Sequence, residues 1–173
     1  MGLLLVKIFI IYDTMYGNTR LVAENIMEGM KEIEGLEIAI GDIEEIDLGD
    51  VANSDTILIG GPNHWGSPTR IIMKLIDNLG KIDLKAKWMA VFDTYLGWDF
   101  KKTTMKMEKR ISVKIPGVTI IASGLSVKVK EMRGSLDEGE LSKCRDFGMI
   151  VANHLKVLLL KFESGSPISL FAS

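Results

Sequence analysis

Five short hydrophobic segments recur along the chain, and each is nearly continuous rather than alternating with polar residues. They are residues 3–11, 36–40, 56–59, 89–92 and 118–121. Unbroken apolar runs of this length are typical of strands that are covered on both faces of a sheet. The pattern therefore predicts five buried strands.

Apolar residues between these segments return at three- and four-residue intervals, which is typical of helices with one buried face. This spacing predicts helices over residues 22–33, 100–111 and 141–158, and the acidic connection from residue 41 to 55 has room for only a short helix over 48–53. Two helix starts are also indicated. We expect Ser67 to cap a helix whose first residue is Pro68, and Asp99 to cap the helix that begins at Phe100.

Strands that alternate with helices in this way build an α/β fold, a doubly wound parallel sheet with right-handed crossovers and helices on both faces. In such a sheet a ligand binds outside the carboxyl ends of the strands. The loops that directly follow the strands are therefore the candidates for chemistry. We expect one domain over residues 1–162 and a tail over residues 163–173.

The composition narrows the possible functions. The chain has 173 residues, of which 47% are hydrophobic, with 1 cysteine and 2 histidines. This excludes a disulfide framework, a zinc finger and a metal cage built from protein ligands alone. The first apolar run is too short to span a bilayer and lacks the features of a signal peptide, so we expect a cytoplasmic protein without a membrane anchor.

Charge is unevenly distributed along the chain. Residues 1–60 hold 12 acidic and 3 basic side chains, whereas residues 61–173 hold 11 acidic and 18 basic ones, for a net charge of -2. A half-basic surface suits an anionic partner or ligand, although solvated helices carry mixed charges for no functional reason. Nucleic acid is not an expected partner, because no basic cluster is interleaved with aromatic residues.

The loop after the first predicted strand, residues 13–19, has donors that a phosphate group needs. Thr14, Asn18 and Thr19 carry hydroxyl or amide groups, Gly17 allows close approach of the backbone, and a helix begins at the end of the loop. The loop lacks the lysine of a nucleoside-triphosphate loop and the three glycines of a dinucleotide-binding turn. An ordinary capped turn uses the same residue types, so both interpretations stay open at this point.

Residues 13–19 resemble the FMN phosphate loop of the flavodoxin-like family, whose pattern is Thr/Ser-x-Thr-Gly-x-Thr. Thr14, Gly17 and Thr19 match this pattern, and Tyr16 stands where many flavodoxins have threonine. A tyrosine there is common in the flavodoxin domain of flavodiiron proteins, which the segment is most similar to. The resemblance implies a short-chain member with a sheet in the order 2-1-3-4-5 and FMN as the cofactor. It also implies an FMN phosphate loop made of Thr14, Met15, Tyr16, Gly17, Asn18 and Thr19.

The loop after the third predicted strand begins Gly60-Gly61-Pro62 and is similar to the second flavin loop of the family. The resemblance implies that Trp65 packs on the flavin ring; the alternative is a tryptophan that anchors the loop in the core. His64 would be solvated, or would hydrogen-bond the ring and exchange a proton near neutral pH. The flavin-binding residues implied here are Pro62, Asn63, His64, Trp65 and Gly66.

The loop after the fourth predicted strand, residues 92–99, resembles the third flavin loop of flavodiiron proteins, roughly Phe-Gly-Ser-Tyr-Gly-Trp. Asp93 replaces a glycine of that pattern, and a carboxylate that points at the flavin would lower its potential. We expect either Tyr95 or Trp98 to pack on the ring and the other to be a core residue. The flavin-binding residues implied here are Thr94, Tyr95, Leu96, Gly97 and Trp98.

Taken together, the three loops predict an FMN-binding electron carrier that acts between redox protein partners. An NAD(P)H-dependent quinone or flavin oxidoreductase of the same fold is the alternative, and a domain that has lost FMN is a third possibility. Typical flavodoxins are strongly acidic near the flavin, whereas the helix expected over residues 100–114 carries six lysine and arginine residues. We expect this helix to face an acidic protein partner, or a nicotinamide dinucleotide phosphate if the chain is a reductase.

Overall fold

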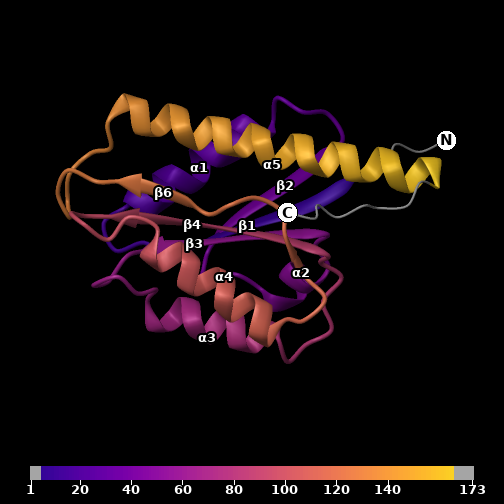
Figure 1. Ribbon diagram of the computed structural model, residues 1–173, viewed down its shortest axis with the longest axis horizontal. Helices are drawn as coiled ribbons and strands as arrows, with labels where there is room; N and C mark the ends of the chain where they lie inside the picture. The colour runs from indigo at the N-terminus through magenta and orange to yellow at the C-terminus, as the bar shows by residue number, and fades with distance from the viewer. Residues whose placement is uncertain (1–4, 166–173) are drawn as a thin grey trace.

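The strands form one parallel sheet between two layers of helices in the computed structural model, which describes residues 5–165 (Figure 1). The strand order is β2-β1-β3-β4-β5, with a sixth strand, β6, that also pairs with β4. This confirms the predicted fold class and strand order. The strands are β1 (Val6–Tyr12), β2 (Leu36–Asp42), β3 (Thr56–Pro62), β4 (Trp88–Tyr95), β5 (Thr119–Ile120) and β6 (Leu125–Lys128).

The fifth predicted strand differs from the structure, because two short strands share its place beside β4. β5 pairs with β4 at Trp88 and Met89, whereas β6 pairs with the far end of β4, from Phe92 to Tyr95. Gly124 lies between β5 and β6, and its N–H donates to the Glu108 carboxylate at 2.8 Å. This N–H is therefore not available for hydrogen bonding between strands. Because β6 pairs with the end of β4, the loop that follows β6 lies beside the carboxyl end of β4.

Two helices cover each face of the sheet (Figure 1). α1 (Asn18–Met30) and α5 (Glu138–Ser164) lie on one face, and α3 (Arg70–Leu79) and α4 (Lys102–Lys114) lie on the other, where Val51 of the short α2 (Leu48–Ala52) also packs into the core. Both the short helix and the periodic helices were predicted near these positions. No helix within residues 5–165 combines the length and apolarity needed to cross a membrane.

Two predicted helix starts are wrong by two residues. α3 is capped by Thr69, whose hydroxyl accepts the Ile72 N–H at 3.5 Å, whereas the Ser67 hydroxyl accepts a hydrogen bond from the Lys106 ammonium at 2.7 Å. α4 begins after Lys101, and the carboxylate of Asp99 pairs with the Lys102 ammonium at 3.0 Å instead of capping the helix.

Alternating residues of the central strands divide the core into two halves. Ile10, Leu58 and Phe92 face α1 and α5, and their neighbours along each strand face α3 and α4. α1 and α5 pack at Gly29 and Gly148, where an added Cβ would overlap a backbone carbonyl oxygen of the opposite helix. The close packing of these two helices therefore depends on glycine.

Cys144 lies in the core on α5, as its place on the apolar stripe predicted. Its side chain is fully buried, and its thiol donates to the Glu140 carbonyl at 3.1 Å. Burial raises the pKa of the thiol to about 12, which keeps it protonated and unreactive.

Candidate functional site

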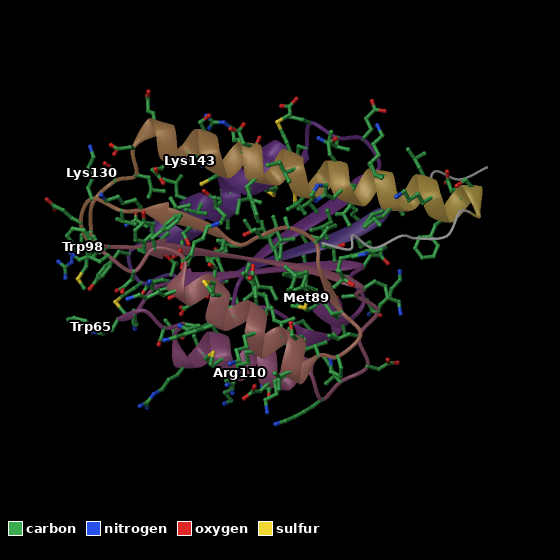
Figure 2. The ribbon with its side chains drawn as sticks, viewed as in Figure 1. Trp65, Met89, Trp98, Arg110, Lys130 and Lys143 are labelled. Atoms are coloured by element: carbon green, nitrogen blue, oxygen red, sulfur yellow. The ribbon has the colours of Figure 1, made fainter. Side chains whose placement is uncertain are left out.

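A cleft opens at the carboxyl ends of β1, β3 and β4, where the fold predicts a ligand site. The end of the molecule that carries it is marked in Figure 2 by Trp65, Trp98 and Lys130. All three predicted loops contribute to its walls. The residues that line the cleft are Thr14, Met15, Tyr16, Asn18, Thr19, Pro62, Asn63, His64, Thr94, Tyr95, Leu96, Val129 and Met132.

Five of the predicted site residues belong to the same loops but do not line the cleft. Two of them, Trp65 and Trp98, are 99% and 96% exposed. The other three are glycines, and each has a positive φ, a backbone conformation that favours glycine. These residues are Gly17, Trp65, Gly66, Gly97 and Trp98.

The predicted phosphate loop leads directly into α1, where the first backbone N–H groups of the helix have no side-chain cap. Gly17 precedes the helix with a φ of 91°, and its N–H donates to the Thr14 hydroxyl at 2.9 Å. No side chain caps α1 and its first turn has no acidic residue, whereas Asp47 and Thr69 cap α2 and α3. The first N–H groups of a helix find no acceptor within it. This end of the cleft therefore fits a dianionic phosphate.

Side-chain hydrogen bonds tie the phosphate loop to the other two loops. The Thr19 and Thr94 hydroxyls are 3.1 Å apart in a buried contact between α1 and β4. The Thr69 hydroxyl at the start of α3 donates to the Asp13 carboxylate at 2.6 Å. The loops after β1, β3 and β4 thus form one connected framework around the cleft.

The second loop turns sharply at Trp65 and Gly66, whose φ values are 54° and 76°. His64 and Ser67 exchange backbone hydrogen bonds of 2.9 and 3.1 Å across this turn, and the Asn63 carboxamide oxygen accepts the Gly66 N–H at 2.6 Å. A tryptophan with positive φ is strained, by about 1–2 kcal/mol. The hydrogen bonds across the turn offset this strain and leave the indole exposed beside the cleft, so the alternative of a core tryptophan is wrong.

The third loop holds its two large aromatic residues in different environments. Tyr95 is partly buried, lines the cleft and packs against the Phe100 ring at 5.6 Å between centroids. Trp98 is 96% exposed and lies outside the cleft wall. The expectation that one of the two is a core residue is therefore wrong, and Tyr95 is the aromatic residue of this loop that faces the cleft.

Asp93 does not point into the cleft. Its side chain is fully buried on the α4 side of the sheet, on the same face of β4 as Met89 and Val91. Burial raises the pKa of Asp93 to about 7. The Ser126 hydroxyl and the Thr104 N–H partly oppose this rise in pKa, but among residues 5–165 no donor reaches the Asp93 oxygens in hydrogen-bonding geometry.

Val129 and Met132 also line the cleft, and the sequence argument missed them. Both follow β6, which was not predicted. A signal for this strand exists, because Leu125, Val127 and Val129 alternate with polar residues, a pattern typical of a short strand. A strand predicted over these residues would have placed the loop that follows it beside the other three loops, at the carboxyl edge of the sheet.

The fold and the cleft define a doubly wound α/β protein with a cleft suited to a phosphate-containing ligand at the carboxyl ends of β1, β3 and β4. Residues 10–138 match the family model described as flavodoxin, and the chain belongs to the flavodoxin family. Members of this family bind FMN and transfer electrons. The predicted family and its cofactor, FMN, are confirmed on this basis.

Similar proteins include two flavodoxins and a type A flavoprotein. A flavodoxin of Aquifex aeolicus is 31% identical over 53% of this chain, and the type A flavoprotein fprA of Rhodobacter capsulatus is 28% identical over 86%. The alignments span 51% and 33% of the lengths of these two relatives. A flavodoxin of Clostridium saccharobutylicum is 26% identical over 87% of this chain and 98% of its own.

Solved structures show the same fold. A flavodoxin from the domain Archaea superposes with a TM-score of 0.75 and 19% identity, over 87% of this chain and 99% of the other. The Flv1 flavodiiron core from Synechocystis sp. PCC6803 gives a TM-score of 0.71 and 19% identity, over 90% of this chain and 37% of the other.

Proposed function

We propose that this chain is an FMN-binding electron carrier that exchanges electrons with protein partners at the open side of its cleft. The observation that carries this proposal is the meeting of three loops in one cleft, with the uncapped N-terminus of α1 in the first loop and the Tyr95 ring in the third. FMN supplies the one- and two-electron chemistry when it is bound.

Neutral groups of the first loop hold the phosphate in this proposal. The hydroxyls of Thr14 and Thr19, the Asn18 carboxamide and the N–H groups of the first turn of α1 are the donors. Arg20, the first basic residue after the loop, is paired with Glu24 at 2.8 Å. These donors carry no charge, so the first loop by itself binds the phosphate without offsetting its negative charge.

The second and third loops hold the ring. Pro62, Asn63 and His64 form one wall of the cleft, and Thr94, Tyr95 and Leu96 form another. We assign Tyr95 to pack on the ring, and Trp65 to close over it from the exposed turn. Gly66, Gly97 and Trp98 shape the rim, and Gly17 shapes the phosphate loop.

We further propose that an acidic redox protein docks beside Trp65. The Lys106 ammonium of α4 donates to the Ser67 hydroxyl at 2.7 Å and places one positive charge beside the turn. The Lys102 side chain also lies against Gly66, but its ammonium is paired with Asp99 at 3.0 Å. Arg110 contributes less to this surface, because Asp77 pairs with it through bonds of 2.8 and 2.6 Å. Exposed tryptophan beside basic residues suits a partner with complementary negative charge.

The compartment proposed for this carrier is the cytoplasm. Its single cysteine is a buried thiol in the core, which suits a protein that needs no disulfide in a reducing environment.

Anaerobic mixing of the FMN-loaded protein with NADH or NADPH tests the proposed role. For a carrier we expect the flavin to stay oxidised for minutes and to be reduced when a flavodoxin reductase is added. Rapid reduction by the nicotinamide alone would overturn the carrier role in favour of the oxidoreductase. Lys106→Gln should slow reduction by an acidic partner at low salt, whereas Lys81→Gln, at the far end of α3, should leave it unchanged.

A further inference from the structure

The segment that follows β6 forms a fourth wall of the cleft. It is anchored where it starts, because the Val129 N–H donates to the Tyr95 carbonyl at 3.0 Å. It is anchored again where it ends, by Leu136 in the core and by an ion pair of 2.6 Å between Lys130 and Asp137. Between these anchors the side chain of Met132 faces the cleft.

Arg133 of this segment reaches over to the phosphate loop. Its guanidinium carbon lies 5.3 Å from the centroid of the Tyr16 ring, which is a cation–π contact. Tyr16 directly precedes Gly17, the residue that leads into α1. The contact therefore holds a positive charge on the side of the cleft that the phosphate loop forms.

We infer that Arg133 is a further FMN-binding residue, held over Tyr16 so that its charge attracts the phosphate dianion. This inference rests on the proposed binding of FMN. The Tyr16 ring positions the guanidinium beside the phosphate loop. Arg20 does not take this role, because Glu24 offsets its charge.

The affinities of Arg133→Gln for FMN and for riboflavin, which lacks the phosphate, distinguish two effects. Loss of the charge weakens the binding of FMN alone, whereas disruption of the cleft wall weakens the binding of both. Arg133→Gln should weaken FMN binding about fivefold at low ionic strength, the order of a solvent-screened charge effect, and should leave riboflavin binding unchanged. The difference should shrink in high salt. Lys81→Gln removes an equal charge at the other end of the sheet and should change neither affinity.

A double-mutant cycle with Tyr16→Ala tests whether the ring positions Arg133. Once the ring is gone, Arg133→Gln should cost FMN affinity much less than it does in the wild-type chain. Unchanged FMN affinity of Arg133→Gln, or an equal loss for FMN and riboflavin, would overturn the inference while leaving FMN binding itself intact. A wild-type chain that binds no FMN would instead overturn the proposed function.

Discussion

Replacing Asp93 with asparagine should stabilise the protein, and the gain should increase with pH. The carboxyl group is fully buried beneath α4, and its two oxygens accept no hydrogen bond from the described residues. Its pKa in the folded protein rises to about 7 from an ordinary value of 3.8. A neutral carboxamide of almost the same shape avoids the cost of burying the charge.

The size of the effect follows from the difference between the two pKa values. The folded chain binds this proton more tightly than the unfolded chain, so stability is complete below the unfolded pKa of 3.8 and is lost as pH rises to about 7. Each pH unit in this window costs about 1.4 kcal/mol. Between about pH 5.5 and pH 8.5, the ionisation of Asp93 should therefore lower the free energy of unfolding by about 2 kcal/mol.

Urea unfolding of the FMN-free wild type and of Asp93→Asn at these two pH values measures this difference. The advantage of the variant should be about 2 kcal/mol larger at the higher pH. Asp83→Asn is the matched control, because Asp83 is exposed, and it should show no such trend. An advantage of Asp93→Asn that is the same at both pH values would refute the assignment of Asp93 as a buried carboxyl with a raised pKa.

Three further substitutions test the framework of the site. Gly17→Val should abolish FMN binding, because a β-branched residue does not adopt a φ of 91°; tight binding, measured by flavin fluorescence, would mean that the phosphate lies elsewhere. Gly148→Ala should lower the free energy of unfolding by about 1–3 kcal/mol, because its Cβ would overlap the Ile26 carbonyl; unchanged urea stability would contradict the helix packing. Thr69→Val should weaken FMN binding by removing the hydrogen bond to Asp13, whereas Thr69→Ser should retain it.

The strands and the cleft were predictable from sequence because burial on both faces leaves a clear pattern. Continuous apolar runs indicated β1 to β4, and in a parallel sheet the loops after these strands must share one edge. Eleven of the sixteen residues proposed for the site line the cleft as a consequence.

The features that sequence reasoning missed depend on contacts between distant residues. β6 is short and half-buried, so its alternation was weaker than the signal of the central strands. Thr69 rather than Ser67 caps α3, because Ser67 belongs to the turn with His64 and its hydroxyl accepts a hydrogen bond from Lys106 of the distant helix α4. The contact between Arg133 and Tyr16 joins residues more than a hundred positions apart, and no local pattern indicates it.

Titration of FMN with the purified, flavin-free protein tests the proposed site most directly. We expect the fluorescence of the flavin to be quenched to an endpoint of one FMN per chain, with much weaker binding of riboflavin because it lacks the phosphate. A protein that leaves FMN fluorescence unchanged, or that binds riboflavin as tightly as FMN, would contradict the assignment of the α1 terminus and the three loops as an FMN site.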